Sequence, residues 1–118
     1  MEHLKRRQDF VAAARALSVA TPGMVVQARN RLDADGPRLG FTCSKKIGNA
    51  VTRNRSKRRM REAARLVLAD TAQCGFDYVL VGRAATAARN FADLQKDLMQ
   101  ALQRLHASPH EVADKGRK

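Results

Sequence analysis

Aromatic residues are scarce in this sequence. Its 118 residues include four Phe, one Tyr and no Trp. Open sheets that read single-stranded RNA stack the bases on several aromatic rings. So few rings argue against a stacking platform of that kind. Recognition of a partner must therefore depend mostly on charge and shape.

Cysteine and histidine are also rare, which bears on metal binding and on disulfides. Cys43 and Cys74 do not have the short spacing of zinc ligands, and His3, His106 and His110 lie near the two ends of the chain. This arrangement predicts reduced thiols, and no metal or other cofactor bound by the protein alone.

Long apolar runs are missing as well. No stretch approaches the roughly 18 apolar residues of a membrane-spanning helix. The first ten residues, MEHLKRRQDF, lack the apolar centre of a secretory signal. We therefore expect a cytoplasmic protein that has no membrane partner.

Acidic residues are greatly outnumbered by basic ones. The chain has 23 Lys plus Arg against 11 Asp plus Glu, a formal net charge of +12 and a pI near 11.1. This balance is typical of nucleic-acid-binding proteins. The segment at residues 45–61 contains no Asp or Glu. Its cations are Lys45, Lys46, Arg53, Arg55, Lys57, Arg58, Arg59 and Arg61. Contacts with several phosphates would give salt-dependent affinity without sequence selectivity.

The carboxylates are scattered along the chain. Hydrolysis of a phosphodiester by a protein requires a metal cluster, or a general base and acid together with a group that stabilises the developing charge. No spacing among the Asp and Glu residues suggests such a site. The sequence therefore predicts that this chain is not a nuclease by itself.

The N-terminal third predicts one helix and the start of a sheet. Phe10, Val11, Ala14 and Leu17 have helical spacing, which predicts an amphipathic helix over residues 9–17. After Pro22-Gly23 a strand is expected at residues 24–28, and residues 33–37 form a turn into a second strand at 38–44. In that strand Leu39, Phe41 and Cys43 are expected to face the core.

The remaining sequence predicts two longer helices that flank a buried strand. Residues 47–50 resemble a tight loop, Thr52 is the expected N-cap of a helix at 53–70, and residues 77–82 form the strand. Asn90 is expected to cap the last helix, which ends at Ser108-Pro109. We thus expect one RNA-binding domain at residues 1–108 and a disordered basic tail at 109–118.

Charge alone leaves several classes of nucleic-acid-binding protein open. A small ribosomal or general RNA-binding protein would place the basic helix on folded RNA and support no cleavage. A DNA-binding regulator would use the same helix for recognition, but the pattern offers no helix-turn-helix pair. DNA is therefore not the expected partner.

The residues around the start of the basic helix resemble a known family. The run SKKIGNAVTRNRSKR at residues 44–58 is similar to the signature of the bacterial ribonuclease P protein component. The resemblance extends over nearly the whole chain. It implies an α/β (α+β) two-layer sandwich with a small mixed sheet, similar to domain two of ribosomal protein S five, with a left-handed crossover.

The resemblance also implies a function for particular residues. The protein would be the subunit of ribonuclease P that binds the catalytic RNA and the 5′ leader of precursor tRNA, while the RNA holds Mg²⁺ and cleaves. The implied contacts with the RNA subunit are Lys45, Lys46, Arg53, Asn54, Arg55, Arg58 and Arg59. The implied leader cleft contains Phe10, Val25, Gln27, Lys57 and Arg61.

Two positions depart from the family pattern. Family members often carry aromatic residues where this chain has Ala14 and Gln27. Stacking contributes roughly 1–3 kcal/mol per base where it occurs. The leader is therefore expected to depend more on Lys57 and Arg61, and its binding to be more sensitive to salt.

Overall fold

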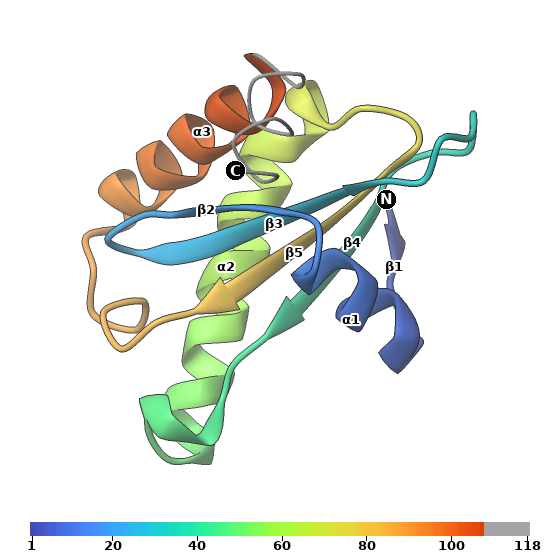
Figure 1. Cartoon of the computed structure of the whole chain (residues 1–118). Coiled ribbons are helices and arrows are strands. Elements are labelled where there is room, and N and C mark those ends of the chain that lie inside the picture. Colours follow the sequence, from blue (N-terminus) through green and yellow to red (C-terminus); the bar gives the residue numbers. More distant parts are fainter. Residues whose placement is uncertain (108–118) are drawn as a thin grey trace, which may run out of the picture.

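The computed structural model describes residues 1–107. The element order is β1-α1-β2-β3-β4-η1-α2-β5-α3, in which three consecutive strands are followed by one short 3₁₀ helix, η1 (Lys45–Ile47), before the longest helix (Figure 1). The strands are β1 (Glu2–His3), β2 (Leu17–Ala20), β3 (Met24–Asn30), β4 (Arg38–Thr42) and β5 (Phe76–Gly82), and the α-helices are α1 (Arg7–Ala14), α2 (Ala50–Thr71) and α3 (Phe91–Ala107).

The strands form one mixed sheet in the order β1-β4-β5-β3-β2. β5 is central and pairs with β3 in antiparallel and with β4 in parallel orientation. The parallel pair β4 and β5 is joined through α2. When both strands point up and α2 lies behind the sheet, β5 is to the right of β4, so this crossover is left-handed (Figure 1). Right-handed crossovers are the rule for such units.

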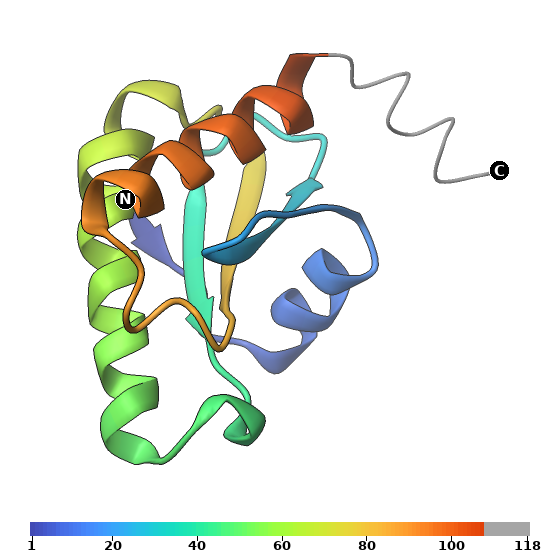
Figure 2. The same cartoon turned by 90° about the vertical axis from the view of Figure 1, so that its left-hand side faces the viewer.

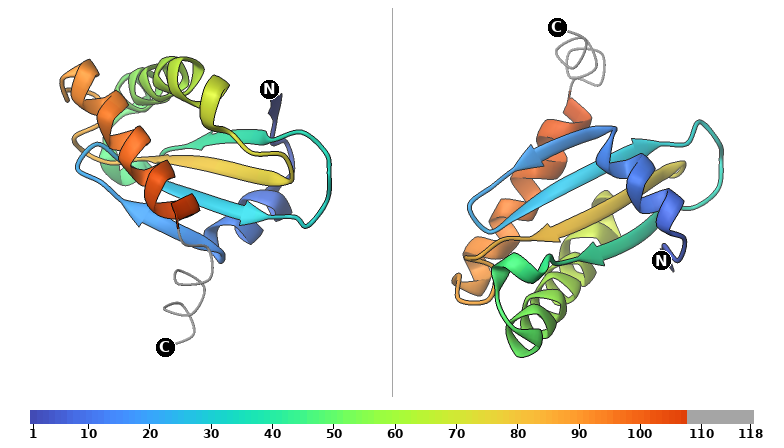
Figure 3. Two further views of the ribbon diagram at one scale, coloured as in Figure 1. Left: turned by 90° about the horizontal axis from the view of Figure 1, so that it is seen from above. Right: turned by 60° about the horizontal axis from the view of Figure 1, so that its bottom comes forward.

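The helices cover the two faces of the sheet unequally. Figure 2 shows α2 on one side of the sheet and α1 on the other, and Figure 3 shows α3 beside α2. The main core lies between the sheet and α2 with α3, where Met60, Leu68 and Leu98 are fully buried. A smaller cluster of Leu4, Ala13 and Val79 lies under α1. The expected α/β class with a small mixed sheet is confirmed.

Two short strands were not predicted from the sequence. β1 is only two residues long, too short to give an alternating pattern. The helix expected at residues 9–17 ends instead at Ala14, and Leu17 begins β2, which pairs with β3. Leu17 fits a helical stripe equally well, so only the pairing with β3 decides its conformation.

The starts of the two long helices depend on asparagine caps. α2 begins at Ala50, earlier than expected, because the Oδ1 atom of Asn49 accepts a hydrogen bond from the Thr52 amide at 2.9 Å. Asn49, and not the expected Thr52, is thus the N-cap. Asn90 caps α3 as expected, accepting from the Ala92 amide at 3.0 Å. The predicted tail at residues 109–118 lies outside the described residues.

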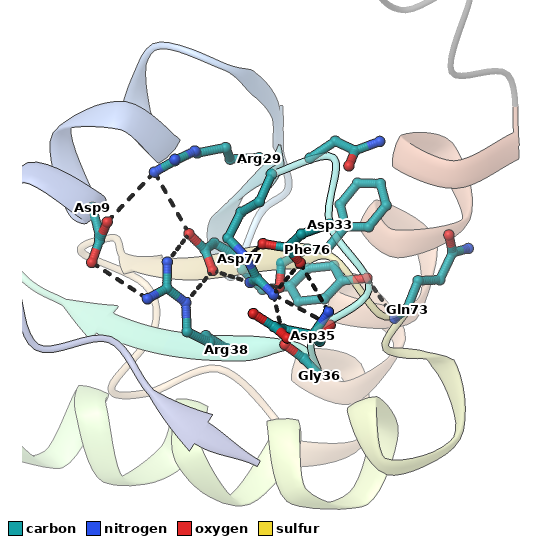
Figure 4. A network of polar contacts seen from close by, with 12 residues as sticks. Asp9, Arg29, Asp33, Asp35, Gly36, Arg38, Gln73, Phe76 and Asp77 are labelled. Atoms are coloured by element: carbon teal, nitrogen blue, oxygen red, sulfur yellow. Dashed lines mark hydrogen bonds and ion pairs between the residues drawn. The ribbon is translucent and has the colours of Figure 1, made fainter.

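A buried carboxylate organises the end of the sheet next to α1. Asp77 on β5 is fully buried, and its Oδ1 accepts hydrogen bonds from Arg31 at 2.6 Å and from Arg38 at 2.7 Å (Figure 4). Arg38 and Arg29 also reach Asp9 of α1, at 3.6 and 3.5 Å. These contacts join β3, β4 and β5 to α1. We call Asp9, Arg29, Arg31, Arg38 and Asp77 the Asp77 network.

The charged form of Asp77 is favoured in the folded protein. Burial by itself would raise the pKa of Asp77, but the hydrogen bonds from Arg38 and Arg31 outweigh it and hold the pKa below its ordinary value. The network therefore stabilises the fold at pH values above the unfolded pKa of about 3.9. This stabilisation is lost as the pH falls through the folded pKa.

We predict that Asp77→Asn lowers the free energy of unfolding at pH 7 by about 3 kcal/mol, because it leaves buried arginines without their counter-charge. Urea unfolding over a pH series would measure it, and the difference from wild type should shrink as the pH falls below the unfolded pKa. The exposed Asp70 provides a control, since Asp70→Asn removes the same charge outside the network. A loss that is equal in both variants, or independent of pH, would contradict the prediction.

Candidate nucleic-acid interface

Three cations of α2 share one side of the helix and lie along β4. Arg53, Lys57 and Arg61 follow one another at intervals of four residues, which places them in a row. The Cζ atom of Arg61 lies 5.4 Å from the centroid of the Phe41 ring on β4. Burial raises the pKa of the Cys43 thiol, while Lys57 and Arg53 nearby act in the opposite direction. We call Arg53, Lys57 and Arg61 the cation row.

Two other arginines of α2 hold the segment between β5 and α3. Arg59 donates to the carbonyl oxygens of Thr86 at 3.2 Å and Ala87 at 2.6 Å, and also to that of Arg89. Arg55 donates to the Ala87 carbonyl at 3.0 Å. Burial lowers the pKa of Arg59, and the charge of Arg55 lowers it further. Because its planar guanidinium is occupied by these carbonyls, Arg59 has a structural role.

The other cations that were predicted to contact RNA find no neutralising partner in the described part of the chain. Within residues 1–107 their side chains make no hydrogen bond to the protein and no ion pair with a carboxylate, and they are Lys45, Lys46, Arg53, Lys57, Arg58 and Arg61. Arg65, by contrast, is paired with Glu62. Asn54 is exposed at the start of α2. Positive charge that finds no partner within the protein favours binding of a polyanion.

The N-terminal end of α2 adds to this positive surface. Val51 is 76% exposed in its first turn, and the two lysines of η1, Lys45 and Lys46, lie exposed just before it. Helix N-termini present backbone N–H groups and a positive dipole to anions. The cation row, Arg58 and the two lysines therefore form one surface suited to phosphate groups.

On the opposite face of the sheet, a cleft lies next to α1. Its volume is about 500 Å³. Phe10 and Gln27, both expected in the leader cleft, line it, and so do Lys5, Arg7, Ala14, Phe41, Thr42, Val79 and Val81. Val25 lies two residues before Gln27 on β3 and therefore on the same face, but it is not part of the lining. We call this cavity the α1 cleft.

A glycine on β4 allows Phe10 to lie close to the sheet. A Cβ atom at Gly40 would come within 2.6 Å of Cε1 of the Phe10 ring and within 3.1 Å of Leu4. Phe10 is only partly buried, packing on the smaller core cluster while lining the α1 cleft. It thus has the structural role of a core residue and also presents an aromatic surface to the cleft.

A second cavity lies on the α2 side of the sheet. It has a volume of about 520 Å³ and lies between α2 and the β1–β4 edge, lined by Arg61, Arg65, Ala64, Leu39 and His3 among others. We call it the α2 groove.

The predicted leader contacts do not share one face of the sheet. Lys57 and Arg61 lie on the α2 side of β4, whereas Phe10, Val25 and Gln27 lie on the α1 side. The structure thus distributes these residues over both faces and not within one cleft.

Three residues that line the α1 cleft, Phe41, Lys5 and Arg7, were not predicted as site residues from the sequence. Phe41 was assigned to the core because it alternates with Leu39, and it does pack on the main core. It also lines the α1 cleft and lies under Arg61, because β4 is near the edge of the sheet. Lys5 and Arg7 belong to a basic N-terminal segment whose position depends on how α1 packs, which the sequence pattern does not indicate.

The described residues offer no grouping suited to a metal ion. In residues 1–107 no three His, Cys, Asp or Glu side chains are close enough together to hold one. None of the helices in this part of the chain is long and apolar enough to cross a membrane.

The two kinds of arginine on α2 should differ in their effect on stability. We predict that Arg59→Ala lowers the free energy of unfolding by about 1–3 kcal/mol, since it leaves backbone carbonyls without donors. Arg58→Ala removes the same charge from the same helix and should change it by less than about 0.5 kcal/mol. Chemical unfolding of both variants would measure this. Equal losses would mean that the Arg59 contacts contribute nothing specific.

Comparison with known proteins places the chain in one family. The family model described as Ribonuclease P matches residues 1–106. The ribonuclease P protein component of Ruegeria pomeroyi is 58% identical over 107 residues, covering 88% of this chain and 86% of that protein. That of Gluconacetobacter diazotrophicus is 48% identical over 102 residues, covering 86% and 88%.

Solved structures agree with this match. The Staphylococcus aureus RNase P protein superposes with a TM-score of 0.74 at 29% identity, covering 90% of this chain and 96% of that one. The Thermotoga maritima RNase P protein gives a TM-score of 0.72 at 29% identity, covering 88% and 97%. Sequence and fold lead to the same conclusion, and this chain belongs to the ribonuclease P protein family.

Proposed function

We propose that this protein is the RNA-binding subunit of a ribonuclease P that removes the 5′ leader of precursor tRNA in the cytoplasm. The observation that carries the proposal is the set of cations on α2 and η1 that have no hydrogen-bond or ion-pair partner within residues 1–107. Its partners would be the RNA subunit and precursor tRNA, and neither DNA nor a membrane.

Contacts with the RNA subunit are assigned to the exposed end of α2. Arg53 and Arg58 can hold phosphate oxygens through two parallel N–H bonds. Lys45 and Lys46 add positive charge, and Asn54 can donate to a phosphate or ribose. Arg55 and Arg59 were predicted to bind RNA as well. Because both are bonded to backbone carbonyls, we assign Arg59 to support of the surface, and Arg55 to both roles.

The leader of precursor tRNA is assigned to the α1 cleft and to the edge of β4. Phe10 offers a ring for an unpaired base, while Gln27 contributes a polar amide and Val25 an apolar surface beside it. Lys57 and Arg61 supply charge for the leader phosphates from the other side of β4. A single strand is the fitting ligand, because its bases are free to stack and its backbone can follow a curved path.

Cleavage itself is assigned to the RNA subunit. Mg²⁺ ions bound by that RNA would stabilise the charge that develops on the attacking and leaving oxygens. The protein's own contribution is to neutralise phosphates and to position the leader. The scattered carboxylates support this division, since residues 1–107 bring no set of three potential ligands together.

Loss of the phosphate contacts should abolish the help that the protein gives to the RNA. We predict that Arg53→Ala/Arg58→Ala removes most of the stimulation of precursor cleavage at low Mg²⁺. It should also reduce the salt slope of binding to the RNA subunit by roughly 2. Lys96→Ala/Arg104→Ala on α3 is a charge-matched control and should behave as wild type.

The outcome for the wild-type protein separates the proposal from its main alternative. A folded wild-type protein that binds RNA but does not stimulate cleavage would be a general RNA-binding protein. A double variant that stimulates as well as wild type would place the contact surface elsewhere.

Leader binding should depend on charge in a measurable way. We predict that Lys57→Ala lowers the salt slope of leader binding by about 1, because one phosphate contact is lost. Gln27→Tyr should instead tighten leader binding roughly fivefold or more through stacking and lower the salt slope, because the leader then depends less on Lys57 and Arg61; equal slopes for this variant and wild type would contradict that expectation. The holoenzyme's affinity for precursor relative to mature tRNA, titrated against salt, would test both. A Lys57→Ala variant with an unchanged slope would count against its assigned contact.

A further inference from the structure

Arg61 differs from the other arginines of α2 in what holds its side chain. Within residues 1–107 it makes no hydrogen bond or ion pair, whereas Arg59 is bound to backbone carbonyls and Arg65 to Glu62. The side chain is exposed, yet its guanidinium lies over the Phe41 ring, 5.4 Å from the centroid. Among the described residues, the Phe41 ring is thus the specific partner of the Arg61 guanidinium.

Phe41 lies where β4 has no neighbouring strand from the described residues, 1–107, on its outer side. β1 pairs only with Arg38 and Leu39, and the last bond across this edge runs from the Leu4 amide to the Leu39 carbonyl. Backbone groups two residues apart point to the same side of a strand. The N–H and C=O groups of Phe41 therefore face the open edge.

Phe41 also connects the two cavities. It lines the α1 cleft, while Arg61, which covers its ring, lines the α2 groove. His3 approaches the same ring with a centroid distance of 6.3 Å. A ligand that enters both cavities must cross the edge of β4 at this point, where it meets an arginine on an aromatic ring and a free strand edge.

We propose that Phe41 is a positioning residue for RNA binding, which holds the Arg61 guanidinium at the edge of β4 for a single strand that passes from the α1 cleft to the α2 groove. The inference rests on the proposed function and deepens it. The outer face of the guanidinium stacks an unpaired base, or its N–H groups bind a phosphate. Both need a single strand, because bases in a duplex are not free to stack on a side chain.

The role of Phe41 explains how this chain, which has few aromatic side chains, can hold a leader. With Ala14 and Gln27 in its walls, the α1 cleft has only Phe10 and Phe41 as aromatic lining residues within the described part of the chain. The Phe41–Arg61 pair supplies a flat, charged surface at the exit of that cleft. A cation over a ring at an exposed site contributes a modest attraction that corresponds to about two- to fivefold in affinity.

The test compares leader-dependent cleavage by the reconstituted holoenzyme. Precursor tRNAs would carry either a leader confined to the α1 cleft or one long enough to cross β4. The ratio of kcat/KM for long over short leader reports the contacts beyond the cleft. We expect Phe41→Leu to lower this ratio about two- to fivefold, through KM and not kcat, while the affinity for the RNA subunit stays unchanged.

Two further variants separate positioning from simple packing. Phe41→Tyr keeps the ring and should retain the wild-type ratio. Phe91→Leu is a matched control, because Phe91 is also partly buried and lies under a guanidinium, that of Arg59 at 6.0 Å, but lines neither cavity. It should leave the ratio unchanged even if it lowers stability.

The possible results are distinct. An unchanged ratio in Phe41→Leu, or equal losses in Phe41→Leu and Phe41→Tyr, would overturn the inference while the proposed function stands. If Phe91→Leu lowered the ratio as much as Phe41→Leu, the effect would come from reduced stability, and the inference would be overturned as well. A wild-type holoenzyme that does not distinguish leader lengths would overturn the leader assignment, and the role of Phe41 with it.

Discussion

The buried charge of Asp77 is the interaction on which the rest of the structure depends. A carboxylate removed from water must be compensated by hydrogen-bonded cations, and Arg31 and Arg38 supply them. Because Arg38 and Arg29 also contact Asp9, the compensation extends to α1 on the outer face of the sheet. The network that holds the strands together therefore also helps to position α1, beside the apolar cluster of Leu4, Ala13 and Val79.

The arginines of this protein have different tasks although their side chains are identical. Those around Asp77 neutralise a buried charge, Arg59 satisfies backbone carbonyls, and Arg65 pairs with Glu62. Arg55, Arg83 and Arg89 are bonded within the protein as well. The net charge of +12 therefore does not show where the unpaired cations lie: within residues 1–107 one group lies on α2 and η1, and others, such as Lys5, Arg7 and Lys96, lie in the N-terminal segment and on α3.

Local sequence patterns predicted most of the helices and strands but not the residues at which they begin and end. The stripe containing Met60 and Leu68 correctly indicated α2, and Asn90 was recognised as a cap. β1 and β2 were missed because very short strands carry no readable alternation, and Leu17 fits helix and strand equally well. The N-cap of α2 was placed at Thr52 because both Asn49 and Thr52 can cap a helix, and only the backbone geometry chooses between them.

The sequence by itself determined the α/β class, the family through residues 44–58, and the presence of a basic helix at the interface. These depend on residue type and short-range spacing. Tertiary structure alone decided which arginines are free, that Gln27 and Arg61 lie on opposite faces of the sheet, and that Phe41 lies at an open edge. Each of these depends on which strands become neighbours, and the partner of a buried or paired side chain is usually far away in the sequence.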